Sequence, residues 1–184
     1  MTFLEKLGAA TDKNNSLLCV GLDSDVSRLP AGQSQLSFNK AIIDATHDLV
    51  CAYKPNTAFY EALGAEGIET LKATCDYIKE TYPEVPIILD AKRADIGTTN
   101  GGYVQFAYDY LGADAITLHP YLGSEALEPF LNRSDKGAII LCRNSNSGAG
   151  EFQDLTVEGV PLYEKVAHAV KDTWNTKGNC LLVV

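Results

Sequence analysis

Basic residues are scarce in this sequence. Its 184 residues include 15 Lys and Arg against 24 Asp and Glu, which gives a formal net charge of −9. Binding of nucleic acid through the phosphate backbone needs clustered Lys and Arg, so the composition argues against that function. No stretch approaches the roughly 20 apolar residues of a membrane-spanning helix. Residues 1–8 lack a long apolar core, which predicts that the chain carries no signal peptide.

Metal-binding and cofactor-binding motifs are also lacking. The five cysteines are odd in number and show no C-x-x-C spacing, and Cys19, Cys51, Cys142 and Cys180 lie inside apolar runs. Cysteine in such a run behaves as a small hydrophobe, so we expect reduced, structural thiols in a cytoplasmic protein. The sequence has no G-x-G-x-x-G after its first strand, no P-loop and no metal-ligand constellation.

Short apolar runs, all but the last followed by a helical pattern, recur along the chain. Nearly continuous apolar strands are typical of a parallel sheet that helices cover. Alternation of strand and helix predicts an α/β protein built from βα units. The predicted strands are residues 17–22, 49–53, 85–89, 113–118, 137–142 and 180–184. The predicted helices are residues 38–49 with Ser37 as N-cap, 67–82, 100–111, 124–131, and 162–173 with Pro161 at its first position.

Two architectures fit this pattern. A (β/α)₈ TIM barrel needs about 250 residues and eight strands, whereas an open α/β sheet can be complete with six. The chain stops at Leu181–Val184, inside a predicted buried strand and without a polar tail. We therefore expect residues 1–184 to form a single (β/α) barrel domain that covers about strands 1 to 6 and whose C-terminal part is missing.

Reactive side chains gather after the predicted strands. In (β/α)₈ enzymes the active site lies at the carboxyl ends of the strands, so this asymmetry predicts one active-site face. The residues concerned are Asp23 after the first strand, Lys54 after the second, Asp90, Lys92 and Asp95 after the third, His119 after the fourth, and Arg143, Asn144 and Ser145 after the fifth.

Asp90 and Lys92 form the most informative pair. Strand side chains alternate, so both should point into the barrel mouth together with Ile88. Lys54, held extended by Pro55, should point the same way. The carboxylate favours the charged form of a neighbouring ammonium. An isolated Asp–Lys pair at a strand end could instead be a surface ion pair that contributes about 0–1 kcal/mol to stability. Together, however, the four residues Lys54, Asp90, Lys92 and Asp95 allow an alternating Lys–Asp–Lys–Asp network.

The motif Asp90-x-Lys92-x-x-Asp95-Ile96-x-x-Thr99 resembles the signature of the orotidine 5′-phosphate decarboxylase family. The D-x-K-x-x-D core is shared with a wider superfamily that includes keto-gulonate-phosphate decarboxylases and hexulose-phosphate synthases. The Lys-Pro-Asn run at 54–56 and the Ile-Gly-x-Thr extension favour the orotidylate enzymes. Residues 19–23, 53–56, 119–123 and 142–148 fall in the order and spacing of the bacterial branch with longer loops.

The resemblance implies decarboxylation of orotidine 5′-phosphate to uridine 5′-phosphate, the last step of de novo pyrimidine nucleotide synthesis. It implies a cofactor-free and metal-free site. Lys92 would stabilise charge at C6 of the pyrimidine and then protonate it as general acid. Asp90 would lie beside the substrate carboxylate and disfavour the ground state. Lys54 would contact both the ribose and Asp90.

The same resemblance implies further substrate contacts and a partner. Asp23 would hydrogen-bond the ribose. Ser145 is the best match to the residue that hydrogen-bonds the pyrimidine edge, with a register open by one or two residues. Asp95 and Thr99 would reach into the neighbouring subunit's site, which implies a homodimer.

The phosphate-binding loops of the family follow strands seven and eight, which this sequence does not contain. We therefore expect the 184-residue polypeptide to be inactive or nearly so, and the parent protein to be an active lyase. Two alternatives stay open at this stage. One is a related sugar-phosphate decarboxylase, which would need Mg²⁺ and a Glu at the position of Lys54. The other is an inactive barrel fragment that only binds nucleotide.

Overall fold

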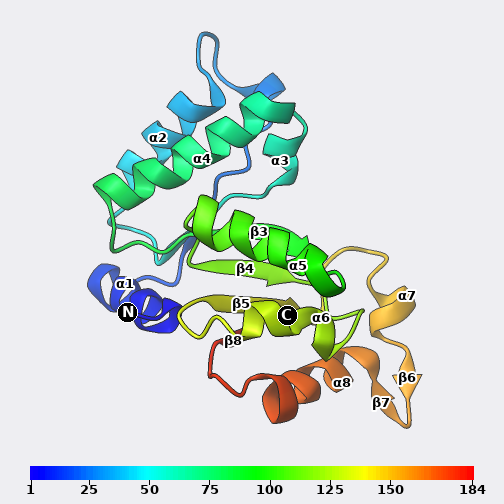
Figure 1. The fold of residues 1–184 in the computed structure, drawn as a ribbon. Coiled ribbons are helices and arrows are strands. Elements are labelled where there is room, and N and C mark those ends of the chain that lie inside the picture. The colour runs from blue at the N-terminus through cyan, green and yellow to red at the C-terminus, as the bar shows by residue number, and fades with distance from the viewer.

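Parallel strands run side by side in chain order in the computed structural model, which describes residues 1–184 (Figure 1). β1 pairs with β2, and β3, β4, β5 and β8 form a continuous parallel sheet. Parallel bridges from Tyr53 to Ile87 and from Asn56 to Asp90 join β2 to β3. The strands are β1 (Cys19–Gly21), β2 (Ala52–Lys54), β3 (Ile88–Arg93), β4 (Ala115–Leu118), β5 (Gly137–Leu141) and β8 (Cys180–Val183).

Helices connect these strands, as the alternating pattern predicts. In Figure 1, α2, α3 and α4 gather at one end of the molecule, next to β3. None of the helices is both long and apolar enough to cross a membrane. The helices are α1 (Phe3–Asn14), α2 (Gln35–Thr46), α3 (Ala58–Glu61), α4 (Gly64–Thr81), α5 (Gly97–Val104), α6 (Ser124–Leu131), α7 (Gly150–Gln153) and α8 (Leu162–Ala169), with a 3₁₀ turn at Val26–Arg28 and π-helical turns at Gln105–Tyr110 and Val170–Trp174.

Several predicted boundaries are wrong. Ser34, not Ser37, is the N-cap of α2, because the two serines form a reciprocal capping box in which each side chain accepts the backbone N–H of the other. Pro161 precedes α8 as its N-cap residue and is extended, with ψ 145°. β3 begins and ends later than predicted, so Asp90 and Lys92 lie within the strand. The sequence pattern missed α1 and the short antiparallel hairpin of β6 (Thr156–Val157) and β7 (Val160–Pro161).

Side chains inside the curved sheet form two layers. The lower layer is apolar and packs against Phe3 of α1, which is 2% exposed; it comprises Ala52, Ile88, Ala115, Ile139 and Leu181. Two residues further along each strand, the upper layer comprises Lys54, Asp90, Thr117, Leu141 and Val183. Since side chains alternate along a strand, one set of inward positions supplies both the core and the lining of the mouth. Helix α1 thus covers the amino ends of the strands, opposite the mouth.

A larger core lies between the strands and the helices outside them. Its fully buried members include Ile43 of α2, Leu71 and Ile78 of α4, Leu89 of β3 and Ile116 of β4. This packing anchors the strands, so that the side chains at their carboxyl ends keep fixed positions.

All five cysteines are free thiols. Cys19 and Cys180 lie within strands, whereas Cys51 and Cys142 lie next to strand ends. Cys75 is fully buried in α4, and burial raises the pKa of its thiol to about 12.

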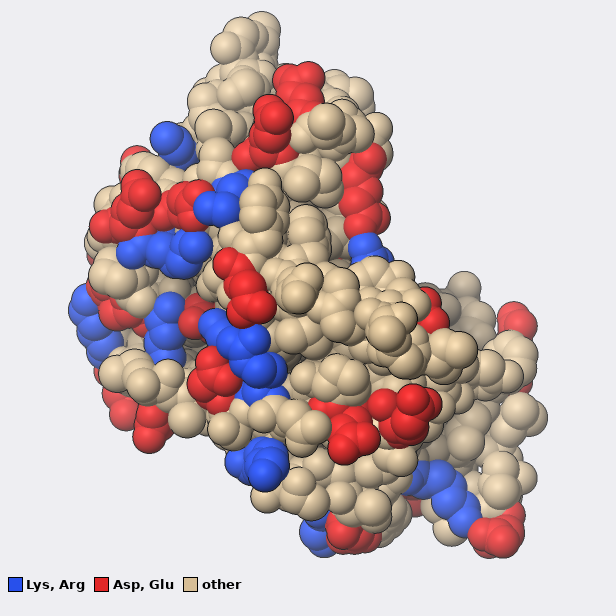
Figure 2. All heavy atoms as spheres, in the orientation of Figure 1, with Lys and Arg blue, Asp and Glu red and all other residues tan.

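Figure 2 shows both signs of charge interspersed on the face of the molecule drawn there, with Lys and Arg beside Asp and Glu.

Candidate active site

A cavity of about 330 Å³ opens at the carboxyl ends of the strands. It brings together four of the predicted site residues, Lys54, Asp90, Lys92 and Ser145. The other lining residues are Thr117, Leu141, Asn144, Asn146 and Val183. Ionic groups therefore occupy the part of the wall formed by β2 and β3, and apolar side chains the part formed by β5 and β8.

Asp90 is the centre of the polar wall. Its Oδ1 accepts hydrogen bonds from Lys92 Nζ at 2.6 Å and from the Thr117 hydroxyl at 2.8 Å. Its Oδ2 accepts from Asn56 Nδ2 at 3.2 Å and from Lys54 Nζ at 3.4 Å. The Asp90 side chain is 10% exposed, so the carboxylate is held almost entirely by protein donors.

Opposing effects set the pKa of Asp90. Burial raises the pKa of this carboxyl group, but the hydrogen bonds from Lys92 and Thr117 and the charges of Lys54 and Lys92 outweigh burial. The net pKa lies below the ordinary value, so Asp90 is an anion at neutral pH. An anion between two ammonium groups gives the cavity a fixed pattern of charge, which costs no reorganisation when a reacting group acquires charge.

Asp23 continues this pattern on the other side of Lys54. Its Oδ2 lies 3.8 Å from Lys54 Nζ, and its Oδ1 accepts the backbone N–H of Asn56 at 2.9 Å. The charges that alternate along this wall are therefore Asp23, Lys54, Asp90 and Lys92. Asp23 also lines a neighbouring hollow of about 430 Å³ in the loop after β1, so the polar wall extends beyond the main cavity.

Lys92 reaches Asp90 across an irregularity in β3. Leu89 is in register with Ile116 and Arg93 with Leu118, so the two strands differ by two residues at this point. Lys92 takes φ +48°, a left-handed conformation that is strained for a non-glycine residue by about 1–3 kcal/mol. The predicted meeting of Asp90 and Lys92 is confirmed. However, the bulge aims the ammonium, and simple alternation along a regular strand does not describe it.

Asp95 and Thr99 lie outside the cavity, on the chain that leads into α5. Asp95 Oδ1 accepts the N–H of Ile96 at 2.6 Å, and its own N–H is donated to Asn100 Oδ1 at 2.8 Å. Asn100 is buried and also donates to the carbonyl of Ala126 at 2.8 Å. These contacts fix the start of α5, while Thr99 is exposed.

Two polar lining residues, Thr117 and Asn146, were not among those expected at the active-site face. Thr117 could have been found, because it stands two residues after Ala115 on a strand whose alternate side chains face inward. Asn146 lies in an irregular loop without periodicity, so only the folded chain places it. Asn144, which was expected on this face, lies in the same loop. The backbone N–H of Asn144 is held by Gln153 Oε1 at 2.7 Å, and its buried Oδ1 has no partner.

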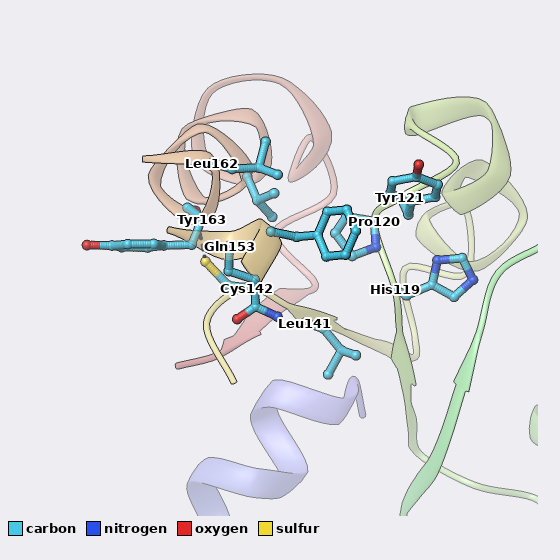
Figure 3. Close-up of a pocket in the computed structure, with 10 residues that line it drawn as sticks. His119, Pro120, Tyr121, Leu141, Cys142, Gln153, Leu162 and Tyr163 are labelled. Atoms are coloured by element: carbon cyan, nitrogen blue, oxygen red, sulfur yellow. Dashed lines mark hydrogen bonds between the residues drawn. The ribbon is translucent and has the colours of Figure 1, made fainter. Parts of the chain in front are cut away.

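A second, apolar cavity of about 620 Å³ adjoins the first and shares Leu141 with it. Figure 3 shows Leu162 and Tyr163 of α8 on one side of this cavity and His119, Pro120 and Tyr121 on the other. His119 Nε2 lies 3.0 Å from the carbonyl oxygen of Ala94, so its ring packs against the chain after β3 and lies outside the ionic cavity. The chain holds no group of three or more His, Cys, Asp or Glu side chains arranged to bind a metal ion.

Comparison with known proteins identifies the family. The family model for the orotidine 5′-phosphate decarboxylase / HUMPS family matches residues 16–180. An orotidine 5′-phosphate decarboxylase from Cellvibrio japonicus is 52% identical over the whole chain, which spans 69% of that relative's length. The chain belongs to the orotidine 5′-phosphate decarboxylase / HUMPS family.

Solved structures of the family share this fold. The OMP decarboxylase of Leishmania donovani is 38% identical with a TM-score of 0.91, and the match covers the whole of this chain and 70% of the other. The UMP synthase of the same organism matches with the same identity and TM-score over 40% of its length. The predicted resemblance and the TIM-barrel fold are thus confirmed, and the chain covers part of the barrel, including six of its parallel strands.

Proposed function

We propose that this protein catalyses the decarboxylation of orotidine 5′-phosphate to uridine 5′-phosphate in pyrimidine nucleotide synthesis. The observation that carries the proposal is Asp90, held as an anion between Lys54 and Lys92 in the cavity of a chain that belongs to this family. Loss of CO₂ leaves an electron pair on C6 of the pyrimidine. A reaction that develops negative charge on a ring carbon needs a fixed cation and a proton donor at that carbon.

In the proposed mechanism the C6–carboxylate bond breaks, CO₂ departs, and the electron pair stays on C6. Lys92 stabilises this charge and donates a proton from its ammonium group to C6, and water later restores the proton. Asp90 orients Lys92 and crowds the substrate carboxylate. Leu141 and Val183 supply an apolar wall, where neutral CO₂ is less costly to accommodate than a carboxylate.

The remaining predicted residues take binding roles in this proposal. Asp23 and Lys54 contact the ribose, and their mutual distance of 3.8 Å allows one hydroxyl group to bridge them. Ser145, which lines the cavity, contacts the pyrimidine edge. We place Asp95 and Thr99 in the site of a second subunit because both lie outside the cavity of their own chain. The proposal therefore includes a homodimer, and it places the protein in the cytoplasm, where free thiols such as these persist.

A metal-dependent sugar-phosphate decarboxylase fits the cavity less well. Such an enzyme would need carboxylates free to bind Mg²⁺. Asp90 is the only carboxylate that lines the cavity, and two ammonium groups and two neutral donors already occupy its oxygens. The position of a metal-binding Glu is taken by Lys54. These residues favour orotidine 5′-phosphate as the substrate.

The assay measures release of labelled CO₂ from orotidine 5′-phosphate by the full product of the gene that encodes this chain. We expect the variant Lys92→Ala to lose at least about 10²-fold in kcat, because it lacks the proton donor. Lys13→Ala is the matched control, since Lys13 forms an exposed ion pair with Glu84 away from the cavity. The proposal fails if the wild-type protein releases no CO₂, or if Lys92→Ala retains most of the activity.

The homodimer is tested by mixing two inactive variants. Lys92→Ala and Asp95→Ala subunits are unfolded together and refolded, so that about half of the dimers contain one subunit of each kind. In a mixed dimer one of the two sites regains both residues, so roughly a quarter of the wild-type activity should return. Recovery of none would contradict the shared site.

A further inference from the structure

Thr117 makes an unusual set of contacts for a residue in the middle of a barrel strand. It lies on β4, is 4% exposed, and faces the cavity. Its hydroxyl donates to Asp90 Oδ1 at 2.8 Å. The same oxygen accepts the backbone N–H groups of Ala91 and Lys92, each at 3.0 Å. One side chain therefore holds the carboxylate of the cavity and the backbone of its neighbouring lysine.

These contacts lie opposite the bulge in β3. In a regular strand successive N–H groups point to opposite sides, so only one of the Ala91 and Lys92 N–H groups would face β4. At the register shift between Leu89 and Arg93 both groups turn towards β4 and meet the Thr117 side chain. The Thr117 oxygen satisfies both groups. It thereby supports the left-handed conformation of Lys92, whose φ is +48° and whose ammonium meets Asp90 at 2.6 Å.

The strands around Asp90 present different kinds of side chain to the cavity. β2 contributes the Lys54 ammonium, which Asp23 contacts from the far side, and β3 contributes the Lys92 ammonium. The chain after β2 contributes the neutral amide of Asn56. On the side of β5 and β8 the lining is apolar, through Leu141 and Val183. The Thr117 hydroxyl is the donor that β4 contributes.

We propose that Thr117 is a positioning residue of the decarboxylase: its hydroxyl keeps the Asp90 carboxylate and the Lys92 ammonium in the geometry required for proton transfer. This inference rests on the proposed function and goes beyond it, since Thr117 acts through Asp90 and Lys92. The hydroxyl oxygen is required, whereas the methyl group is not. Thr117→Ser should therefore keep the positioning of Asp90 and Lys92. Thr117→Val, which has the same shape without the hydroxyl, should lose it.

The first test needs no substrate. The carboxyl carbon of Asp90 is followed by ¹³C NMR during a pH titration of aspartate-labelled protein, with the Asp90→Asn variant assigning the signal. The Thr117 hydrogen bond is one of the causes that lower the pKa of Asp90, so Thr117→Val should raise this pKa and Thr117→Ser should leave it near the wild-type value. Thr46→Val is the matched control, because the Thr46 hydroxyl bonds Ile42 and Tyr53 on α2 and β2, away from the cavity.

The second test measures kinetics on the full product of the gene. We expect Thr117→Val to lower kcat about ten-fold or more with little change in KM, and to move the acid limb of kcat towards higher pH. Thr117→Ser should restore both quantities. If Thr117→Val does not fold, Thr117→Ala removes the hydroxyl without adding a methyl group and takes its place.

The inference is overturned if the valine or alanine variant leaves the pKa of Asp90 unchanged. It is also overturned if serine fails to restore the wild-type titration, or if Thr46→Val shifts it equally. Because the titration is read without substrate, these outcomes are separate from failure of the proposed function, which would be seen as absence of CO₂ release by the wild-type protein.

Discussion

The replacement Asp90→Asn tests whether the charged cluster stabilises the fold as well as shaping the site. The carboxylate accepts four hydrogen bonds, two on each oxygen, from Lys92 and Thr117 and from Lys54 and Asn56. An asparagine amide has a single acceptor oxygen, so its NH₂ group must face two donors. The variant therefore loses two hydrogen bonds and the charge that both ammonium groups contact.

The magnitude follows from these contacts. A hydrogen bond to a charged group contributes about 1.5–3 kcal/mol net, and a buried donor left without a partner costs about 1–3 kcal/mol. Lys54 and Lys92 side chains are 33% and 47% exposed, so both ammonium groups can turn to water and recover part of the loss. We expect Asp90→Asn to lower the free energy of unfolding by about 2–3 kcal/mol at pH 7.

The pH dependence has a definite sign. The folded-state pKa of Asp90 lies below its unfolded value of about 3.9, so the carboxylate contributes stability that is fully present above that value. This contribution is lost as the pH falls through the folded-state pKa. The difference in stability between wild type and Asp90→Asn should be constant between about pH 6 and 8 and should shrink below about pH 4.

Urea unfolding followed by the fluorescence of Trp174 measures these values. Asp135→Asn is the control: Asp135 pairs with Arg133 at 3.3 Å, but its side chain is 55% exposed, so the loss should stay below about 1 kcal/mol. An Asp90→Asn variant as stable as the wild type at pH 7 would refute the reasoning. It would mean that holding the four donors around Asp90 costs as much free energy as their contacts with the carboxylate contribute.

Three further outcomes are expected. Tyr60→Phe should lower the free energy of unfolding in urea by about 1–2 kcal/mol, because the fully buried Tyr60 hydroxyl donates to the carbonyl of Leu22 at 2.6 Å and accepts from Asn39 at 2.9 Å; no loss would contradict it. Gly137→Ala should lower the free energy of unfolding by about 1–3 kcal/mol, since the new Cβ would overlap the Phe3 ring. Gly8→Ala in α1 meets open space and should raise the free energy of unfolding by up to about 1 kcal/mol. Melting curves of both variants test these opposite signs. For the 184-residue polypeptide, calorimetry should give dissociation constants for uridine and uridine 5′-phosphate within about ten-fold of each other, because Asp90 holds both cations that line the cavity. The same polypeptide should show little or no turnover of orotidine 5′-phosphate. Much tighter binding of uridine 5′-phosphate than of uridine would refute this.

The sequence by itself determined the class of fold and the charged side chains that line the cavity. β4 and β5 are buried along almost their whole length, so they stand out as apolar runs whether or not their neighbours are known. Alternation, a local property of the chain, was enough to predict that Lys54 and Asp90 face the cavity. Lys92 was expected there for the same reason but reaches Asp90 through the bulge. Helix α1 was missed, since only Phe3 and Ala10 of it are buried and its role, to cover the amino ends of the strands through Phe3, depends on residues far away in the sequence.

Only the tertiary structure decided how the site is assembled. The two-residue register shift in β3 depends on the pairing with β4, and it sets the left-handed conformation that carries Lys92 to Asp90. The contact of Thr117 with Asp90 joins two strands, and the place of Asp23 beside Lys54 joins the loop after β1 to β2. Periodicity describes one strand at a time, whereas hydrogen bonds between strands and the lowered pKa of Asp90 arise from side chains that only folding brings within a few ångströms of one another.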